Sequence, residues 1–226
     1  MHSVSDTSRP EISLRATNLT KLYGETVALW NVDLAARGGE LVAVLGPNAS
    51  GKTTLLRILA GLTAPTGGRI SWSGSSTQRP RIAYVGHATH LFEALTAFEN
   101  LELAARLAGR DPGSVVELLG RLGIESSAGR RCAGLSAGTL RRVALGRALA
   151  TAPDALILDE PFASLDGAAA DVVVEALAGA GREGRLVVVA THDDARSRVL
   201  ATKTVWLSAG RVVPPDSRAT GKLRLA

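Results

Sequence analysis

One short segment of the sequence has residue types and spacing that suit phosphate binding. Residues 46–53 read Gly-Pro-Asn-Ala-Ser-Gly-Lys-Thr and match the pattern G-x-x-x-x-G-K-[ST]. Small residues let backbone N–H groups turn toward phosphate oxygens at a helix N-terminus, Lys52 can neutralise their charge, and the Thr53 hydroxyl can bind Mg²⁺. The alternative is a tight strand-to-helix turn with a chance lysine. The apolar run before the segment and the helical spacing after it favour nucleotide binding.

A pair of carboxylates ends an apolar run elsewhere in the chain. Residues 155–158 are followed directly by Asp159 and Glu160. Charges at the mouth of a buried strand are costly unless a cation lies there, so Asp159 can hold Mg²⁺ and Glu160 can polarise an attacking water. The alternative is a strand that simply ends in polar residues. Together with the loop at 46–53, the pair predicts hydrolysis of a nucleotide.

Two weaker features point to the same chemistry. Leu135-Ser136-Ala137-Gly138 precedes a helical run, so Ser136 or Gly138 could be an N-cap, serving either as a plain cap or as a second phosphate-binding helix N-terminus. His192 follows an apolar run at 186–190, where a parallel strand delivers side chains to the same crevice. A lone histidine is more often an ordinary surface or core residue, and only its position in the chain makes it a candidate.

The elements that would position these residues form a parallel α/β core. Residues 41–45, 155–158 and 186–190 are continuous apolar runs of strand length, which is typical of buried parallel strands. Residues 12–37 alternate apolar and polar residues, which predicts a half-exposed antiparallel sheet. The other expected elements are helices at 53–62, 140–150 and 168–180, short strands at 69–72 and 81–85, a helical region at 96–120 broken at 109–113, a short helix after His192 and a closing hairpin at 204–207 and 211–213.

Composition places the chain among globular proteins of a reducing compartment. It has 226 residues, 46% of them hydrophobic, with one cysteine and four histidines, which excludes a disulfide framework and a cysteine-rich zinc site. No apolar stretch approaches the roughly 18 residues that cross a bilayer. The net charge of +5 comes without a dense basic block, so no nucleic-acid partner is expected. These features predict a cytoplasmic location.

The motifs, taken in order, resemble the ATP-binding subunit of ABC transporters. The resemblance covers about residues 12–213 and implies a single α/β domain: a P-loop NTPase core with a parallel sheet, an N-terminal antiparallel β lobe and an inserted α-helical lobe at about 88–140. Residues 1–11 are then a flexible N-terminus and residues 214–226 a C-terminal tail. The motifs that carry the resemblance are Gly46 to Thr53, Leu135 to Gly138, Leu156 to Glu160, Ser164-Leu165-Asp166 and Thr191-His192.

The resemblance also implies how ATP and Mg²⁺ are bound. Two subunits pair head to tail in the ATP-bound state, as a homodimer or with a similar ATPase subunit, and each ATP lies between the phosphate loop of one and the Ser136 motif of the other. Tyr23 stacks on adenine, Glu160 is the general base, His192 contacts the γ-phosphate and Asp166 communicates across the dimer. Thr53 and Asp159 bind the metal. The full nucleotide-binding set is Tyr23, Gly46, Pro47, Asn48, Ala49, Ser50, Gly51, Lys52, Thr53, Thr54, His87, Leu135, Ser136, Ala137, Gly138 and Asp166.

Integral membrane transporter subunits are the further partners that the resemblance implies, with the chain peripheral at the cytoplasmic face of the cell membrane.

The sequence departs from the family pattern at Ala49, His87, Ala137 and Thr139. His87 stands where the family has a metal-sensing glutamine, either as a neutral substitute or without that role. Four segments resemble the haem-export ATPase of cytochrome c biogenesis: Gly86-His87, 95–101, 135–138 and 141–145. An exporter of another substrate and a soluble non-transport ABC-type ATPase are the alternatives.

Overall fold

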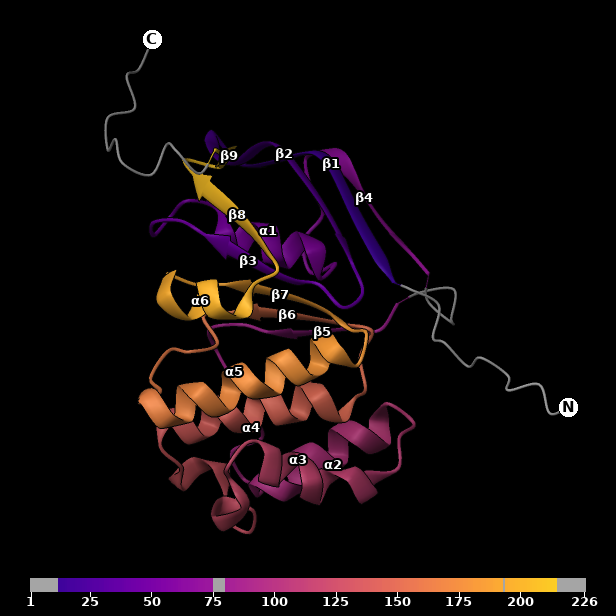
Figure 1. The fold of residues 1–226 in the computed structure, drawn as a ribbon, viewed down its shortest axis with the longest axis vertical. Helices are drawn as coiled ribbons and strands as arrows, with labels where there is room; N and C mark the ends of the chain where they lie inside the picture. Colours follow the sequence, from indigo (N-terminus) through magenta and orange to yellow (C-terminus); the bar gives the residue numbers. More distant parts are fainter. Residues whose placement is uncertain (1–11, 75–79, 193, 215–226) are drawn as a thin grey trace, which may run out of the picture.

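The computed structural model describes residues 12–74, 80–192 and 194–214, and the predictions for 1–11 and 215–226 lie outside them. Two sheets form the framework (Figure 1). The first is antiparallel, in the order β2-β1-β4, with β1 at Ser13–Tyr23, β2 at Thr26–Arg37 and β4 at Gly67–Ser73. The second, in the order β5-β6-β7-β3-β8-β9, contains β3 (Leu41–Leu45), β5 (Ile82–Val85), β6 (Ala155–Asp159), β7 (Leu186–Ala190), β8 (Lys203–Ser208) and β9 (Arg211–Val213).

The second sheet is parallel from β5 to β8, and β9 pairs antiparallel with β8. Its strands β3, β6 and β7 are buried because both faces are covered: α1 (Lys52–Leu59) and the antiparallel sheet lie on one side, and the remaining long helices lie on the other (Figure 1). Successive residues of a strand point to opposite faces. Leu156 and Leu158 of β6 therefore pack on the helical side, whereas Ala155 and Ile157 pack on the side of α1.

The helical lobe contains α2 (Ala97–Leu107) and α3 (Val115–Arg121), which pack against α4 (Ala137–Ala150). Three single 3₁₀ turns join them, at Pro112–Ser114, Glu125–Ser127 and Cys132–Gly134. A capping box starts α2, since the Thr96 hydroxyl accepts from the Glu99 amide and the Glu99 carboxylate accepts from the Thr96 amide. Further along the chain lie α5 (Gly167–Arg182) and α6 (Asp194–Leu200).

The predicted fold class is confirmed, with shifts at element boundaries. The first core helix begins at Lys52 and ends at Leu59, two turns long rather than extending to residue 62, and Gly61 follows it with a φ of 72°. The predicted hairpin at 204–207 and 211–213 is present as β8 and β9. The predicted end of the helical lobe near residue 140 falls inside α4, so this helix runs from the lobe into the core.

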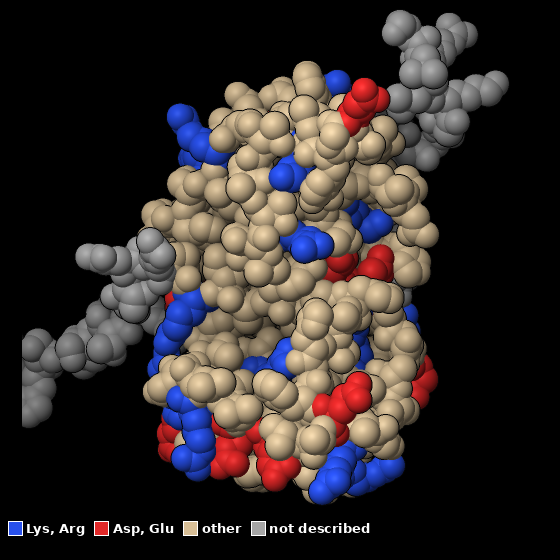
Figure 2. Space-filling view, turned by 180° about the vertical axis from the view of Figure 1, so that it is seen from behind, with Lys and Arg blue, Asp and Glu red and all other residues tan. Residues whose placement is uncertain are grey.

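Charged side chains are dispersed over the surface. Figure 2 shows Lys and Arg scattered over one face, with Asp and Glu beside them at the end formed by the helical lobe. Among the described residues, no helix is both long enough and apolar enough to cross a membrane.

Candidate functional site

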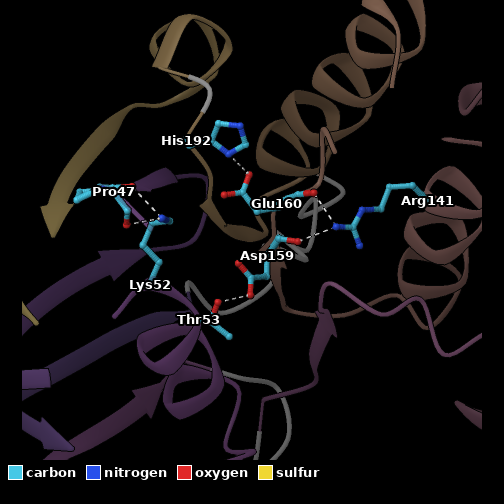
Figure 3. Close-up of polar contacts among 8 residues, drawn as sticks. Pro47, Lys52, Thr53, Arg141, Asp159, Glu160 and His192 are labelled. Carbon is cyan, nitrogen blue, oxygen red and sulfur yellow. Dashed lines mark hydrogen bonds and ion pairs between the residues drawn. The ribbon is translucent and has the colours of Figure 1, made fainter. Parts of the chain in front are cut away.

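The loop between β3 and α1 folds closely around the Lys52 side chain. Lys52 is only 7% exposed, and its Nζ donates to the carbonyl oxygens of Gly46 at 2.8 Å and Pro47 at 3.1 Å (Figure 3). Gly51 has a φ of 104°, and a Cβ there would lie 2.5 Å from the carbonyl oxygen of Ala28, so only glycine fits. The loop therefore holds an ammonium group at the N-terminus of a helix, where anions are favoured.

Thr53 and Asp159 bring two oxygen ligands together from distant parts of the chain. The Thr53 hydroxyl donates to Asp159 Oδ2 at 2.7 Å, although Thr53 lies in the first turn of α1 and Asp159 ends β6. Asp159 is 4% exposed. A hydroxyl beside a carboxylate is the hard-oxygen donor set that Mg²⁺ takes, with phosphates and water completing its coordination. No cluster of three or more His, Cys, Asp and Glu capable of holding a metal occurs among the described residues.

Glu160 and His192 are joined by a hydrogen bond. Glu160 Oε2 lies 3.0 Å from His192 Nδ1 (Figure 3), and the Glu160 amide donates to the carbonyl of Ala190 at 2.8 Å. The Glu160 backbone is left-handed, with a φ of 50°, a conformation that costs energy in a residue with a Cβ. This turn follows directly on the end of β6, and the bond to His192 fixes the orientation of the carboxylate.

A cavity of about 420 Å³ unites most of the predicted site. The predicted residues that line it are Asn48, Ala49, Ser50, Gly51, Lys52, Thr53, Thr54, His87, Asp159 and Glu160. Ser50 Oγ is buried and has no hydrogen-bond partner among the described residues, so the loop contains one unsatisfied hydroxyl. Cationic, hydroxyl and carboxylate groups converge on a space large enough for a small ligand.

The remaining predicted residues lie outside this cavity. Tyr23 is 49% exposed with Lys21 Nζ 5.0 Å from its ring centre, and it pairs with Thr26, which does line the cavity. Of the two predicted N-caps, Ser136 and Gly138, the structure has Ser136 as the N-cap of α4. Ser136 is exposed, and its Oγ accepts from the Thr139 amide at 3.2 Å. Asp166 is likewise exposed and caps α5.

The Ser136 and Asp166 segments nevertheless lie against each other. A Cβ on Gly138 would come within 2.7 Å of the Ser164 carbonyl oxygen, so this contact requires glycine. The predicted residues therefore fall into two groups: those in or beside the cavity, and those at 135–138 and 166, where Ser136, Ala137 and Asp166 are exposed and Leu135 is buried.

Arg141 is a polar residue beside the site that the sequence analysis did not identify. It is 5% exposed, and its guanidinium donates to the carbonyl oxygens of Gly86, His87, Asp159 and Glu160. Burial lowers the pKa of Arg141, while the charges of Asp159 and Glu160 oppose that shift. The signal in the sequence was its spacing: Ala144 and Leu145, three and four residues on, are buried on the same helix face.

A second cavity, of about 460 Å³, opens between β5, α2 and α4. Its walls include Ala104 and Ala108, from the end of α2, and Ala144 and Ala148 of α4. Tyr84 of β5 also lines it, and burial raises the pKa of its phenol. The small side chains of the two helices leave this space open.

Curated relatives match most of this chain. The cytochrome c biogenesis ATP-binding export protein CcmA 2 of Cupriavidus metallidurans is 39% identical, over 79% of this chain and 89% of its own length. The sulfate/thiosulfate import ATP-binding protein CysA 2 of Chromobacterium violaceum is 38% identical, over 86% of this chain and 56% of its own length. The chain thus spans little more than half of the latter. The tungstate uptake system ATP-binding protein TupC of Peptoclostridium acidaminophilum is 34% identical, over 91% of this chain.

Solved structures share the fold. A bacterial ABC transporter cassette solved as a dimer has a TM-score of 0.81 at 30% identity, covering 89% of this chain and 97% of its own. The same cassette in a post-hydrolysis state, bound to ADP and Pi, has a TM-score of 0.80. The sequence model of the ABC transporter family matches residues 29–163. With the fold, the motifs and these relatives in agreement, the chain belongs to the ABC transporter family, as one of its ATP-binding subunits.

Proposed function

We propose that this chain hydrolyses ATP at the 420 Å³ cavity, with Glu160 as the general base. The observation that carries the proposal is the 2.7 Å hydrogen bond between Thr53 Oγ1 and Asp159 Oδ2, because it places the phosphate loop against the carboxylates at the end of β6. Lys52 lies beside Thr53, and Glu160 lies next to Asp159 (Figure 3). Phosphoryl transfer requires little beyond such positioning and charge neutralisation.

Each residue then has a separate task. Lys52 exchanges its two carbonyl partners for phosphate oxygens, and the free hydroxyl of Ser50 offers a further donor. Glu160 accepts a proton from the attacking water, with its carboxylate held in place by His192. Thr53 and Asp159 would hold Mg²⁺, which when bound neutralises charge on the β- and γ-phosphates. The exposed Tyr23, beside the cavity wall at Thr26, would stack on the adenine.

The site is completed by a second ATP-binding subunit. Ser136 and Asp166 are exposed and lie outside the cavity of their own chain. In a head-to-tail dimer, the 135–138 segment of each chain would close over the ATP of the other. The dimeric form of the cassette with a TM-score of 0.81 supports this arrangement.

The closing and opening of this dimer would change the conformation of membrane transporter subunits bound to it. This chain would lie peripherally at the cytoplasmic face of the membrane. The 460 Å³ cavity beside the helical lobe, lined by small residues of α2 and α4, is the proposed place where a membrane subunit inserts a segment. Binding of ATP would close the dimer and hydrolysis would open it, so nucleotide state and membrane-subunit shape are linked.

Haem export for cytochrome c biogenesis is the transport process that we propose. The CcmA 2 relative supports it, as do the motifs around His87 and Ser136, and His87 lines the same cavity as Glu160. Import of an oxyanion is the second candidate, because CysA 2 and TupC are named as import and uptake proteins at similar identity.

ATP binding is tested with a Lys52→Met variant. We expect its affinity for Mg-ATP, measured by calorimetry, to fall at least about tenfold, since a charge-assisted contact to phosphate is lost. Lys203→Met is the matched control, because Lys203 Nζ also donates to a carbonyl oxygen, that of Ala35, but outside the cavity. Equal loss of affinity in both variants, or in neither, would contradict the assigned role of Lys52.

The transported substrate is tested in a deletion strain of the source organism. Haem export predicts loss of c-type cytochromes, restored by the wild-type gene but not by Glu160→Gln. Normal c-type cytochromes together with lost uptake of sulfate or tungstate would overturn this assignment in favour of oxyanion import.

A further inference from the structure

Arg141 connects two backbone segments of the proposed site, one with Glu160 and the other with His87. Its Nη2 donates to the carbonyl oxygens of Asp159 at 3.0 Å and Glu160 at 2.7 Å, at the end of β6. Its Nη1 donates to the carbonyl oxygens of Gly86 and His87, in the turn after β5. Figure 3 shows the two contacts of Arg141 with Asp159 and Glu160. One planar guanidinium therefore sets the spacing between the backbone of Glu160 and that of His87.

The environment of Arg141 is unusual for a buried cation. The side chain is 5% exposed, and no carboxylate of the described residues lies within ion-pair distance of it. All four of its hydrogen bonds go to backbone oxygens. Burying a cation is costly, and here the four hydrogen bonds and the charges of Asp159 and Glu160 offset that cost. Arginine at this position is therefore specified by the carbonyl oxygens of two separate segments, which a planar group with several donors can reach together.

The helix that carries Arg141 also carries Ser136. Ser136 caps the N-terminus of α4, and Arg141 lies about one and a half turns further along. Arg147 of the same helix donates to the carbonyl oxygens of Thr89 at 2.9 Å and of His90. Both Arg141 and Arg147 of α4 thus bind the loop that follows β5, and Arg141 also binds the end of β6.

We propose that Arg141 is a positioning residue for ATP hydrolysis, holding the backbones of Glu160 and His87 at fixed places on α4. The proposal rests on the role of Glu160 proposed above. When the Ser136 end of α4 meets ATP bound to the second subunit, the guanidinium transmits the displacement of the helix to the segments of Glu160 and His87 together. Hydrolysis would then depend on the position of the helical lobe.

The test is the kcat and KM for ATP of purified full-length Arg141→Lys and Arg141→Met. Methionine removes every donor, and lysine keeps the charge but cannot serve both segments with one nitrogen. We expect kcat of the methionine variant to fall about 100-fold, the effect of a displacement near 1 Å, with KM within about threefold of wild type. Lysine should restore part of the loss.

Arg142→Met is the matched control. Arg142 lies on the same helix and also donates to two carbonyl oxygens, those of Leu122 and Gly123, in the helical lobe. We expect its kcat to stay within about twofold of wild type, inside the range of changes remote from the chemistry. If the control loses as much kcat as Arg141→Met, the effect belongs to α4 in general and the proposal is wrong.

The proposal is also overturned if kcat of both Arg141 variants stays within about twofold of wild type, or if KM rises while kcat is unchanged. Circular dichroism shows whether the methionine variant folds, and the lysine variant decides alone if it does not. Failure of the proposed function would be seen separately, as an absence of hydrolysis by the wild-type chain.

Discussion

The hydrogen bond between Thr53 and Asp159 can be removed with little change of shape, by the substitution Thr53→Val. The bond is 2.7 Å long and its acceptor is a carboxylate that is 4% exposed. A hydrogen bond to a charged group contributes about 1.5–3 kcal/mol. We therefore expect the free energy of unfolding, measured by urea denaturation without nucleotide, to fall by about 2 kcal/mol. In a chain of this size that lowers Tm by about 4–8 °C.

The same variant separates metal binding from phosphate binding. Lys52 and the backbone amides of the loop are unchanged, so ATP without Mg²⁺ should bind Thr53→Val about as tightly as it binds wild type. The gain in affinity on adding Mg²⁺ should be lost, because one of the two proposed ligands is gone. Thr53→Ser keeps the hydroxyl and is the control for both measurements. A valine variant that is as stable as wild type and still gains affinity from Mg²⁺ would refute the reasoning.

Two further predictions concern stability. Ala49 is exposed and has a φ of 60°, so Ala49→Gly should relieve left-handed strain. Glycine also gives the unfolded chain more entropy, and the net result should be a rise of about 0.5–1 kcal/mol in the free energy of unfolding. A lower Tm than wild type would contradict this. The pKa of Glu99 is lowered below its ordinary 4.5, mainly by the hydrogen bond from the Thr96 amide. The ionised carboxylate therefore stabilises the fold above pH 4.5, and this contribution is lost as the pH falls through the lowered pKa. Glu99→Gln should therefore be less stable than wild type at neutral pH and approach it in acid, whereas a difference that is constant with pH would count against the capping box as its source.

The parallel core could be predicted from sequence because its cause is local. Burial at every position is seen in residues 41–45, 155–159 and 186–190. Continuous apolar runs are typical of strands in a sheet whose two faces are both covered. The phosphate loop could also be predicted from sequence, because its glycines are required locally. At Gly51, for example, the backbone is left-handed and the Ala28 carbonyl oxygen leaves no room for a Cβ. The cavity lining followed from the rule that parallel strands end at one edge of a sheet.

Long-range backbone contacts could not be predicted in the same way. Arg141 donates to carbonyl oxygens of residues far away in the sequence, and every residue type has a carbonyl, so no acceptor pattern marks the partners. The end of α1 was also misjudged, because apolar residues continue beyond Leu59 while the backbone turns at Gly61. The roles assigned to Tyr23, Ser136 and Asp166 remain predictions, because they depend on a ligand and a second chain.

Glu160→Gln tests the central claim most directly, measured as ATP turnover and as oligomeric state on size exclusion with Mg-ATP. The substitution keeps the size of the side chain and removes its capacity as a base. The account predicts that ATP binding is retained, that turnover falls by about 100-fold or more, and that an ATP-bound dimer accumulates. Hydrolysis at the wild-type rate would contradict the assignment of Glu160 as the general base.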